Sequence, residues 1–64
     1  MENVIFKCYS DNNKDSIFIC ASLIRKITHI SSNYCTKLIV EYYDDEFCVN
    51  CNYVCDYIEP MQNI

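Results

Sequence analysis

The chain has 64 residues, six cysteines, no glycine and a formal net charge of −4 at pH 7. A chain this short forms a single domain of marginal stability, because about 60 residues bury only about 60% of the surface that the unfolded state exposes. No apolar run reaches the roughly 20 residues that span a bilayer, and the N-terminus lacks the basic start and long apolar stretch of a secretory signal. We therefore predict a cytoplasmic, intracellular protein with no membrane association, unless a leader was removed.

Charge divides the chain into two unequal parts. All five basic residues lie in residues 1–37, whereas residues 38–64 hold six of the nine acidic residues and no base. Nucleic-acid binders usually show clustered Lys and Arg, so we expect no direct binding of DNA or RNA. The acidic part fits either a basic protein partner or a solvated face that keeps a small protein soluble.

The first half of the chain predicts three strands. In residues 3–10 the side chains alternate between two faces, which predicts a strand. Residues 11–15, "DNNKD", predict a turn because Asn and Asp tolerate left-handed backbone conformations. Residues 16–20, "SIFIC", predict a second strand that forms a hairpin with the first. Residues 21–24, "ASLI", predict half a turn of helix or a kink. Residues 25–31, "RKITHIS", alternate again as a third strand.

The clearest strand pattern is "YCTKLIVEYY", residues 34–43. It places three apolar side chains on one face and three mixed ones on the other: Leu38, Val40 and Tyr42 against Ile39, Glu41 and Tyr43. The acidic "DDE" at residues 44–46 predicts a tight turn. "FCVN" then predicts the partner strand of a β-hairpin, with Phe47 and Val49 on the same face.

From Cys51 the apolar residues change their period. Cys51, Val54, Cys55 and Ile58 fall at i, i+3, i+4 and i+7, as on one face of a helix, and Pro60 marks its end. A helix of about two turns is stable only when it packs on something else. The predicted fold class is therefore α+β: a small, mostly antiparallel sheet of four to five strands with one short C-terminal helix packed on it.

Three cysteines, Cys48, Cys51 and Cys55, lie within eight residues of one another. Abundant Asn, Ile, Lys and Tyr are typical of an AT-rich genome, in which Cys replaces Ala or Val in a core, so we favour reduced core thiols. The alternatives are a small zinc-binding module and a disulfide or redox pair. Zinc needs four ligands, and a fourth would come from Cys8, Cys20, Cys35 or His29. No metal or other cofactor belongs to the favoured interpretation.

The sequence does not predict an enzyme. His29 has no Asp or Ser at a spacing that would make it a catalytic partner, and adjacent acids on an exposed hairpin tip are solvated. The chain lacks a phosphate-binding glycine loop, a nucleophile elbow and a zinc-protease helix.

The order of elements resembles the short flagellar FlbD/SwrD family. The resemblance covers "VIFKCYS", "SIFICASLIRKITHI" with its Leu23, Ile24 and Ile27, and "KLIVEYYDDEFCVN" running into "NYVCDYIEP". It implies strands, a hairpin and a terminal helix, and a regulatory role of the flagellar type as an alternative function. That family usually carries Asn-Gly where this chain has Asp44 and Asp45, so no functional residue is carried over.

The predicted function is that of a small non-catalytic interaction factor, an inhibitor encoded by a phage or mobile element, such as an anti-CRISPR or other anti-defence protein. Its partner would be a larger host protein with a basic surface or nucleic-acid groove. Tyrosines anchor interfaces and acids imitate phosphates. The predicted partner-binding residues are Glu41, Tyr43, Asp44, Asp45, Glu46, Tyr53, Asp56, Tyr57 and Glu59. Open sheet edges also make a homodimer possible, since only Lys7, Lys26 and Lys37 guard them.

Overall fold

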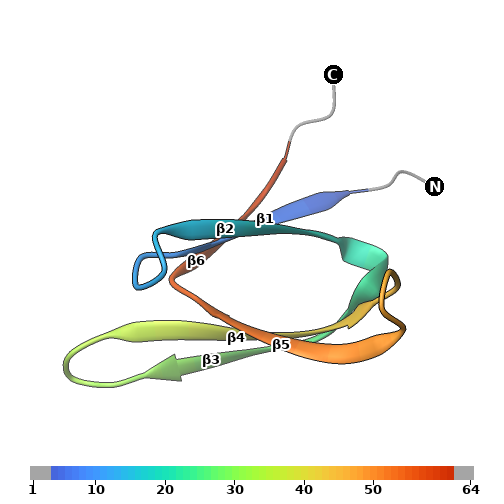
Figure 1. The fold of residues 1–64 in the computed structure, drawn as a ribbon. Helices are drawn as coiled ribbons and strands as arrows, with labels where there is room; N and C mark the ends of the chain where they lie inside the picture. The colour runs from blue at the N-terminus through green and yellow to red at the C-terminus, as the bar shows by residue number, and fades with distance from the viewer. Residues whose placement is uncertain (1–3, 62–64) are drawn as a thin grey trace.

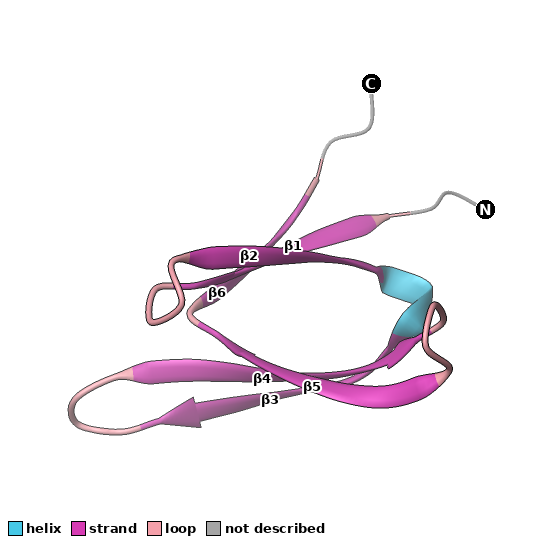
Figure 2. Cartoon of the chain, viewed as in Figure 1, coloured by secondary structure: helices cyan, strands magenta, loops and turns pink. Residues whose placement is uncertain are grey.

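A computed structural model describes residues 4–61 and consists of strands joined by short turns (Figures 1 and 2). Two three-stranded antiparallel sheets, in the orders β2-β1-β6 and β3-β4-β5, form two layers. The antiparallel character was predicted, and it is confirmed. The elements are β1 (Ile5–Ser10), β2 (Asp15–Cys20), the short 3-10 turn η1 (Ala21–Leu23), β3 (Ile24–Ser31), β4 (Thr36–Asp44), β5 (Val49–Cys55) and β6 (Tyr57–Pro60).

The predicted α+β fold class is wrong, because the segment expected to be a helix forms two strands. β5 pairs with β4 along its whole length, and β6 pairs with β1. Cys51, Tyr53 and Cys55 face the other sheet, whereas Val54 is 50% exposed. A bend at Asp56 then changes which side chains face inward, so that Ile58 also packs on the core. The inward-facing side chains alternate along β5 and shift at the bend, and this produces the same apolar spacing as one face of a helix.

The predicted hairpin is confirmed as β4 and β5, with Leu38, Val40 and Tyr42 on the inner face. Its turn is longer than predicted and covers residues 45–48. Phe47 and Cys48 therefore belong to the turn and not to the returning strand. In the turn between β1 and β2, Lys14 takes the left-handed conformation (φ 51°) that was expected of Asn or Asp.

The two sheets are joined differently on their two sides. On one side β5 continues into β6 through the bend at Asp56, whose N–H donates to the Tyr9 carbonyl at 2.7 Å. On the other side η1 connects β2 to β3, and within residues 4–61 neither strand pairs with the other. The structure is therefore a sandwich that is closed along β5 and β6 and open between β2 and β3 (Figure 1).

The centre of the sandwich contains sulfur. Its buried residues are Cys8 from β1, Ile19 from β2, Val40 from β4 and Cys55 from β5. Burial and the adjacent Cys55 thiol raise the pKa of Cys8 to about 11, and burial also raises the pKa of Cys55. Both side chains are therefore neutral thiols at physiological pH and pack as small apolar groups. No helix within residues 4–61 is long and apolar enough to cross a membrane.

Candidate protein-docking groove

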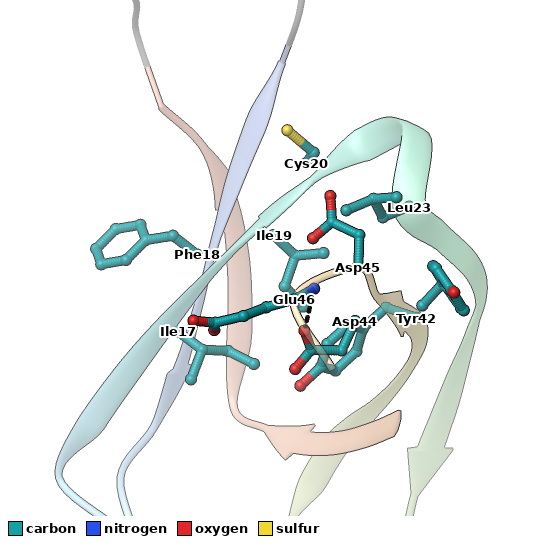
Figure 3. Close-up of a pocket in the computed structure, with 10 residues that line it drawn as sticks. Ile17, Phe18, Ile19, Cys20, Leu23, Tyr42, Asp44, Asp45 and Glu46 are labelled. Atoms are coloured by element: carbon teal, nitrogen blue, oxygen red, sulfur yellow. Dashed lines mark hydrogen bonds between the residues drawn. The ribbon is translucent and has the colours of Figure 1, made fainter. Parts of the chain in front are cut away.

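A groove of about 440 Å³ lies where the open side of the sandwich meets the turn between β4 and β5 (Figure 3). One wall is β2 with the adjoining η1, and the other is the end of β4 with its turn. Four consecutive residues of β2 line it, although their side chains alternate between the faces of the sheet, so the groove runs along the strand's edge. Its lining residues are Ile17, Phe18, Ile19, Cys20, Leu23, Tyr42, Tyr43, Asp44, Asp45 and Glu46.

The turn that forms the acidic wall is held by its own first carboxylate. Asp44 Oδ1 accepts the N–H groups of Glu46 at 3.0 Å and Phe47 at 3.3 Å. Cys48 closes the turn in the left-handed conformation, with φ at 56°, which a glycine would adopt without steric cost. Asp44 therefore shapes the turn, while Asp45 and Glu46 extend from it.

The carboxylates of Asp45 and Glu46 have no basic partner in the described part of the chain. The ion pairs there join Lys7 to Glu59 and Lys37 to Asp56. Close to these acids the groove has an apolar wall that includes Ile19 and Leu23. An apolar channel with an acidic rim suits a ligand that is itself apolar and basic.

Two aromatic side chains extend this surface. Phe47 at the tip of the turn is 70% exposed. Tyr43 lies under the guanidinium of Arg25, whose central carbon is 5.7 Å from the ring centroid, and a hydrogen bond with Cys48 raises the pKa of the Tyr43 hydroxyl. Tyr43 is thereby fixed at the base of the turn, whereas Phe47 is free to contact a partner.

The structure brings together four of the predicted partner-binding residues at this groove: Tyr43, Asp44, Asp45 and Glu46. Glu41 lies away from it, on the outer face of β4, opposite Lys26 in the register of β3 and β4. The Tyr53 hydroxyl donates to the Asp15 carbonyl at 3.4 Å on the inner side of the sandwich.

The remaining predicted residues have structural contacts elsewhere. Asp56 accepts the Asp11 N–H at 2.6 Å and pairs with Lys37 Nζ at 2.5 Å, and these contacts lower its pKa. Tyr57 stacks on Tyr9 with ring centroids 5.2 Å apart. Glu59 pairs across the strands with Lys7 at 3.9 Å.

The β2 wall of the groove was not predicted as a site. Reading "SIFIC" as a strand gave the element but not its position at an open edge. The one available signal was Phe18, which alternation places opposite Ile17 and Ile19, and it is 59% exposed (Figure 3).

The three closely spaced cysteines, Cys48, Cys51 and Cys55, lie in different environments. Cys55 is buried, as the core interpretation predicted; Cys51 is half-buried, and Cys48 is exposed in the turn, so the core interpretation is wrong for Cys48. All six thiols are free. Within residues 4–61, no three His, Cys, Asp or Glu side chains gather closely enough to hold a metal ion.

Comparisons with family models, curated proteins and solved structures returned no match. The flagellar resemblance therefore stays a prediction, and the terminal helix that it implied is replaced by β5 and β6.

Proposed function

We propose that this chain is a non-catalytic interaction factor that covers a basic surface of a larger protein. Its composition favours an inhibitor that is encoded by a phage or mobile element and blocks a host protein, such as an anti-CRISPR or other anti-defence factor. In that form the covered surface would be a basic nucleic-acid groove of the host protein.

One observation supports the proposal above the others: the acidic side chains beside the groove lack the lysine partners that Asp56 and Glu59 have. Asp56 and Glu59 each have a lysine within 4.0 Å, and Asp45 and Glu46 have none among residues 4–61. Unpaired carboxylates beside exposed Phe47 combine electrostatic attraction with an apolar anchor.

A capture experiment with charge-reversed variants tests this function. The tagged protein is incubated with bacterial lysate, and the bound proteins are compared between the wild type and an Asp45→Lys, Glu46→Lys variant. We expect the variant to lose the partner, because lysines at the rim repel a basic surface. Raising the salt concentration should weaken capture by the wild type, since screening shortens the range of such attractions.

The matched control is Glu41→Lys with Glu59→Lys, which has the same net charge as the groove variant but alters the outer faces of the two sheets. The control should retain the partner. Equal retention by both variants, or equal loss, would show that the groove rim is not the interface.

A further inference from the structure

We propose that the groove receives an extended, basic segment of the partner, which pairs with the open edge of β2 as an added strand. The inference rests on the proposed function and specifies the chemistry of the partner at the same site. Strand addition provides affinity through main-chain hydrogen bonds and specificity through alternate side chains.

The hydrogen-bond pattern of β1 and β2 shows which backbone groups of β2 are open. Antiparallel pairs alternate between hydrogen-bonded and non-hydrogen-bonded residues. The Ala21 N–H donates to the Val4 carbonyl at 2.8 Å, so the pairs two and four residues further along, Phe6 with Ile19 and Cys8 with Ile17, are also hydrogen-bonded. The N–H and C=O groups of Phe18 therefore point away from β1.

The residues on either side of Phe18 define the extent of the open edge. Ser16 also points away from β1, but its N–H donates to Asp15 Oδ1 at 2.7 Å. Phe18 and Cys20 remain as consecutive outward-facing positions, and both line the groove. A strand laid along this edge would pair with them first.

The opposite edge of the same sheet is protected. The Met61 N–H donates to the Ile5 carbonyl at 2.8 Å, which makes Phe6 and Pro60 a non-hydrogen-bonded pair. The Pro60 nitrogen therefore faces the outer edge of β6, where it has no hydrogen to donate. The edge of β3 is unsuited to a basic segment, because Arg25 and Lys26 are exposed on it.

The side chains around the groove favour an occupant that alternates apolar and basic residues. Successive side chains of a strand point to opposite sides. Side chains on the inner side of β2, beside Ile17 and Leu23, would face Asp45 and Glu46 (Figure 3), so basic residues suit these positions. The alternate side chains would lie on the outer side beside the exposed ring of Phe18, where apolar residues suit. Charge complementarity selects a lysine- or arginine-bearing segment over an acidic one.

The test uses an acetylated and amidated octapeptide that alternates valine with lysine, titrated into isotope-labelled protein and followed by NMR. We expect saturable shifts of the Phe18 and Cys20 amide signals and slower hydrogen exchange at both. An octapeptide alternating valine with glutamate should bind at least about tenfold more weakly.

The decisive comparison is between Phe18→Pro and Phe18→Ala. Both remove the ring, but only proline removes the outward N–H, and neither removes a hydrogen bond to β1. We expect Phe18→Pro to bind the lysine peptide roughly tenfold more weakly than Phe18→Ala. If Phe18→Pro does not fold, synthetic protein with N-methylphenylalanine at position 18 deletes the same N–H.

Equal affinity of the two variants, shifts confined to β3, or no binding at millimolar peptide would overturn strand addition at β2. A wild-type dimer that Phe18→Pro dissociates would also overturn it, by making a second copy the occupant. The proposed function has a separate readout. If the Asp45→Lys, Glu46→Lys variant loses the captured partner while Phe18→Pro retains it, the function stands and strand addition falls.

Discussion

The two ends of the sandwich use acidic residues in opposite ways. At the end formed by the β5–β6 bend, Asp56 binds both the Lys37 ammonium group and the Asp11 N–H. At the other end, beside η1, Asp45 and Glu46 have no lysine or arginine within ion-pair distance in residues 4–61. At the first end the Asp56 carboxylate is paired, and at the second the carboxylates of Asp45 and Glu46 are available for binding.

This difference shows that the acidity of residues 38–64 is not one property. A formal charge counts Asp56 and Asp45 equally, whereas the fold neutralises one and leaves the other beside a groove. Variants that separate stability from binding can break or sharpen the distinction.

The largest loss of stability should come from the core that both ends share. Val40 is fully buried and Val54 is 50% exposed on the outer face of the next strand. Val40→Ala should lower the free energy of unfolding by about 2–3 kcal/mol, because it removes buried methyl groups and leaves a cavity. Val54→Ala is the matched control and should cost less than about 0.5 kcal/mol. Urea unfolding measures both, and similar losses would contradict the assigned faces.

The contacts of Asp56 at the β5–β6 bend should make the free energy of unfolding depend on pH in the acid range. Contacts with Lys37 and with the Asp11 N–H lower the pKa of Asp56 below its ordinary value of 3.8. The unfolded carboxyl then takes up its proton at higher pH than the folded one. The stability from these contacts is therefore fully present above the ordinary value and is lost as pH falls through the lower folded value.

Asp56→Asn should lower stability at pH 7 and flatten its decline below about pH 4. Urea unfolding at a series of pH values measures the effect. Glu59→Gln is the control for loss of one paired carboxylate elsewhere. An Asp56→Asn protein with the wild-type acid profile would remove Asp56 from the closure of this end.

The strands of the β4–β5 hairpin were largely predictable from the sequence, but the bend that carries β5 into β6 was not. Alternation in residues 36–44 gave the correct faces of Leu38 and Val40, because one side is buried and the other is not. The same alternation continues through Cys51, Tyr53 and Cys55 and indicates a strand. The bend at Asp56 adds Ile58 to the inner side, and period alone does not distinguish that arrangement from a helix.

The groove was only half predictable for a related reason. Asp44, Asp45 and Glu46 form a local turn that composition reveals. The β2 wall depends on which strands remain unpaired, and strand order is a long-range property that short patterns do not contain. The pairing of Phe6 with Pro60 joins residues far apart in the chain.

A smaller effect should appear in the turn of the open end. Cys48 has a positive φ of 56°, which is unfavourable for a residue with a Cβ. Cys48→Gly should raise the free energy of unfolding by about 0.5 kcal/mol, the relief of strain being partly offset by glycine's greater freedom in the unfolded chain. Cys48→Ala removes the thiol but keeps the strain and should show no gain. Thermal unfolding of both variants measures the difference.

The smallest effect on stability should come from neutralising the open rim. Asp45→Asn with Glu46→Gln should leave the free energy of unfolding within about 0.5 kcal/mol of wild type, since neither carboxylate is paired in the described structure. Denaturant unfolding at pH 7 measures it. A loss comparable to that of Asp56→Asn would mean that the two ends do not differ.

The position of β1 between β2 and β6 has a consequence for synthesis. Among the strands of residues 4–61, the central strand of this sheet is made first and one of its two neighbours is made last. The local hairpins of β3, β4 and β5 can form as the chain leaves the ribosome, whereas β1 keeps one side unpaired until residues 57–60 emerge. Until then β1 has an unpaired strand edge, which is a surface through which incompletely folded chains aggregate.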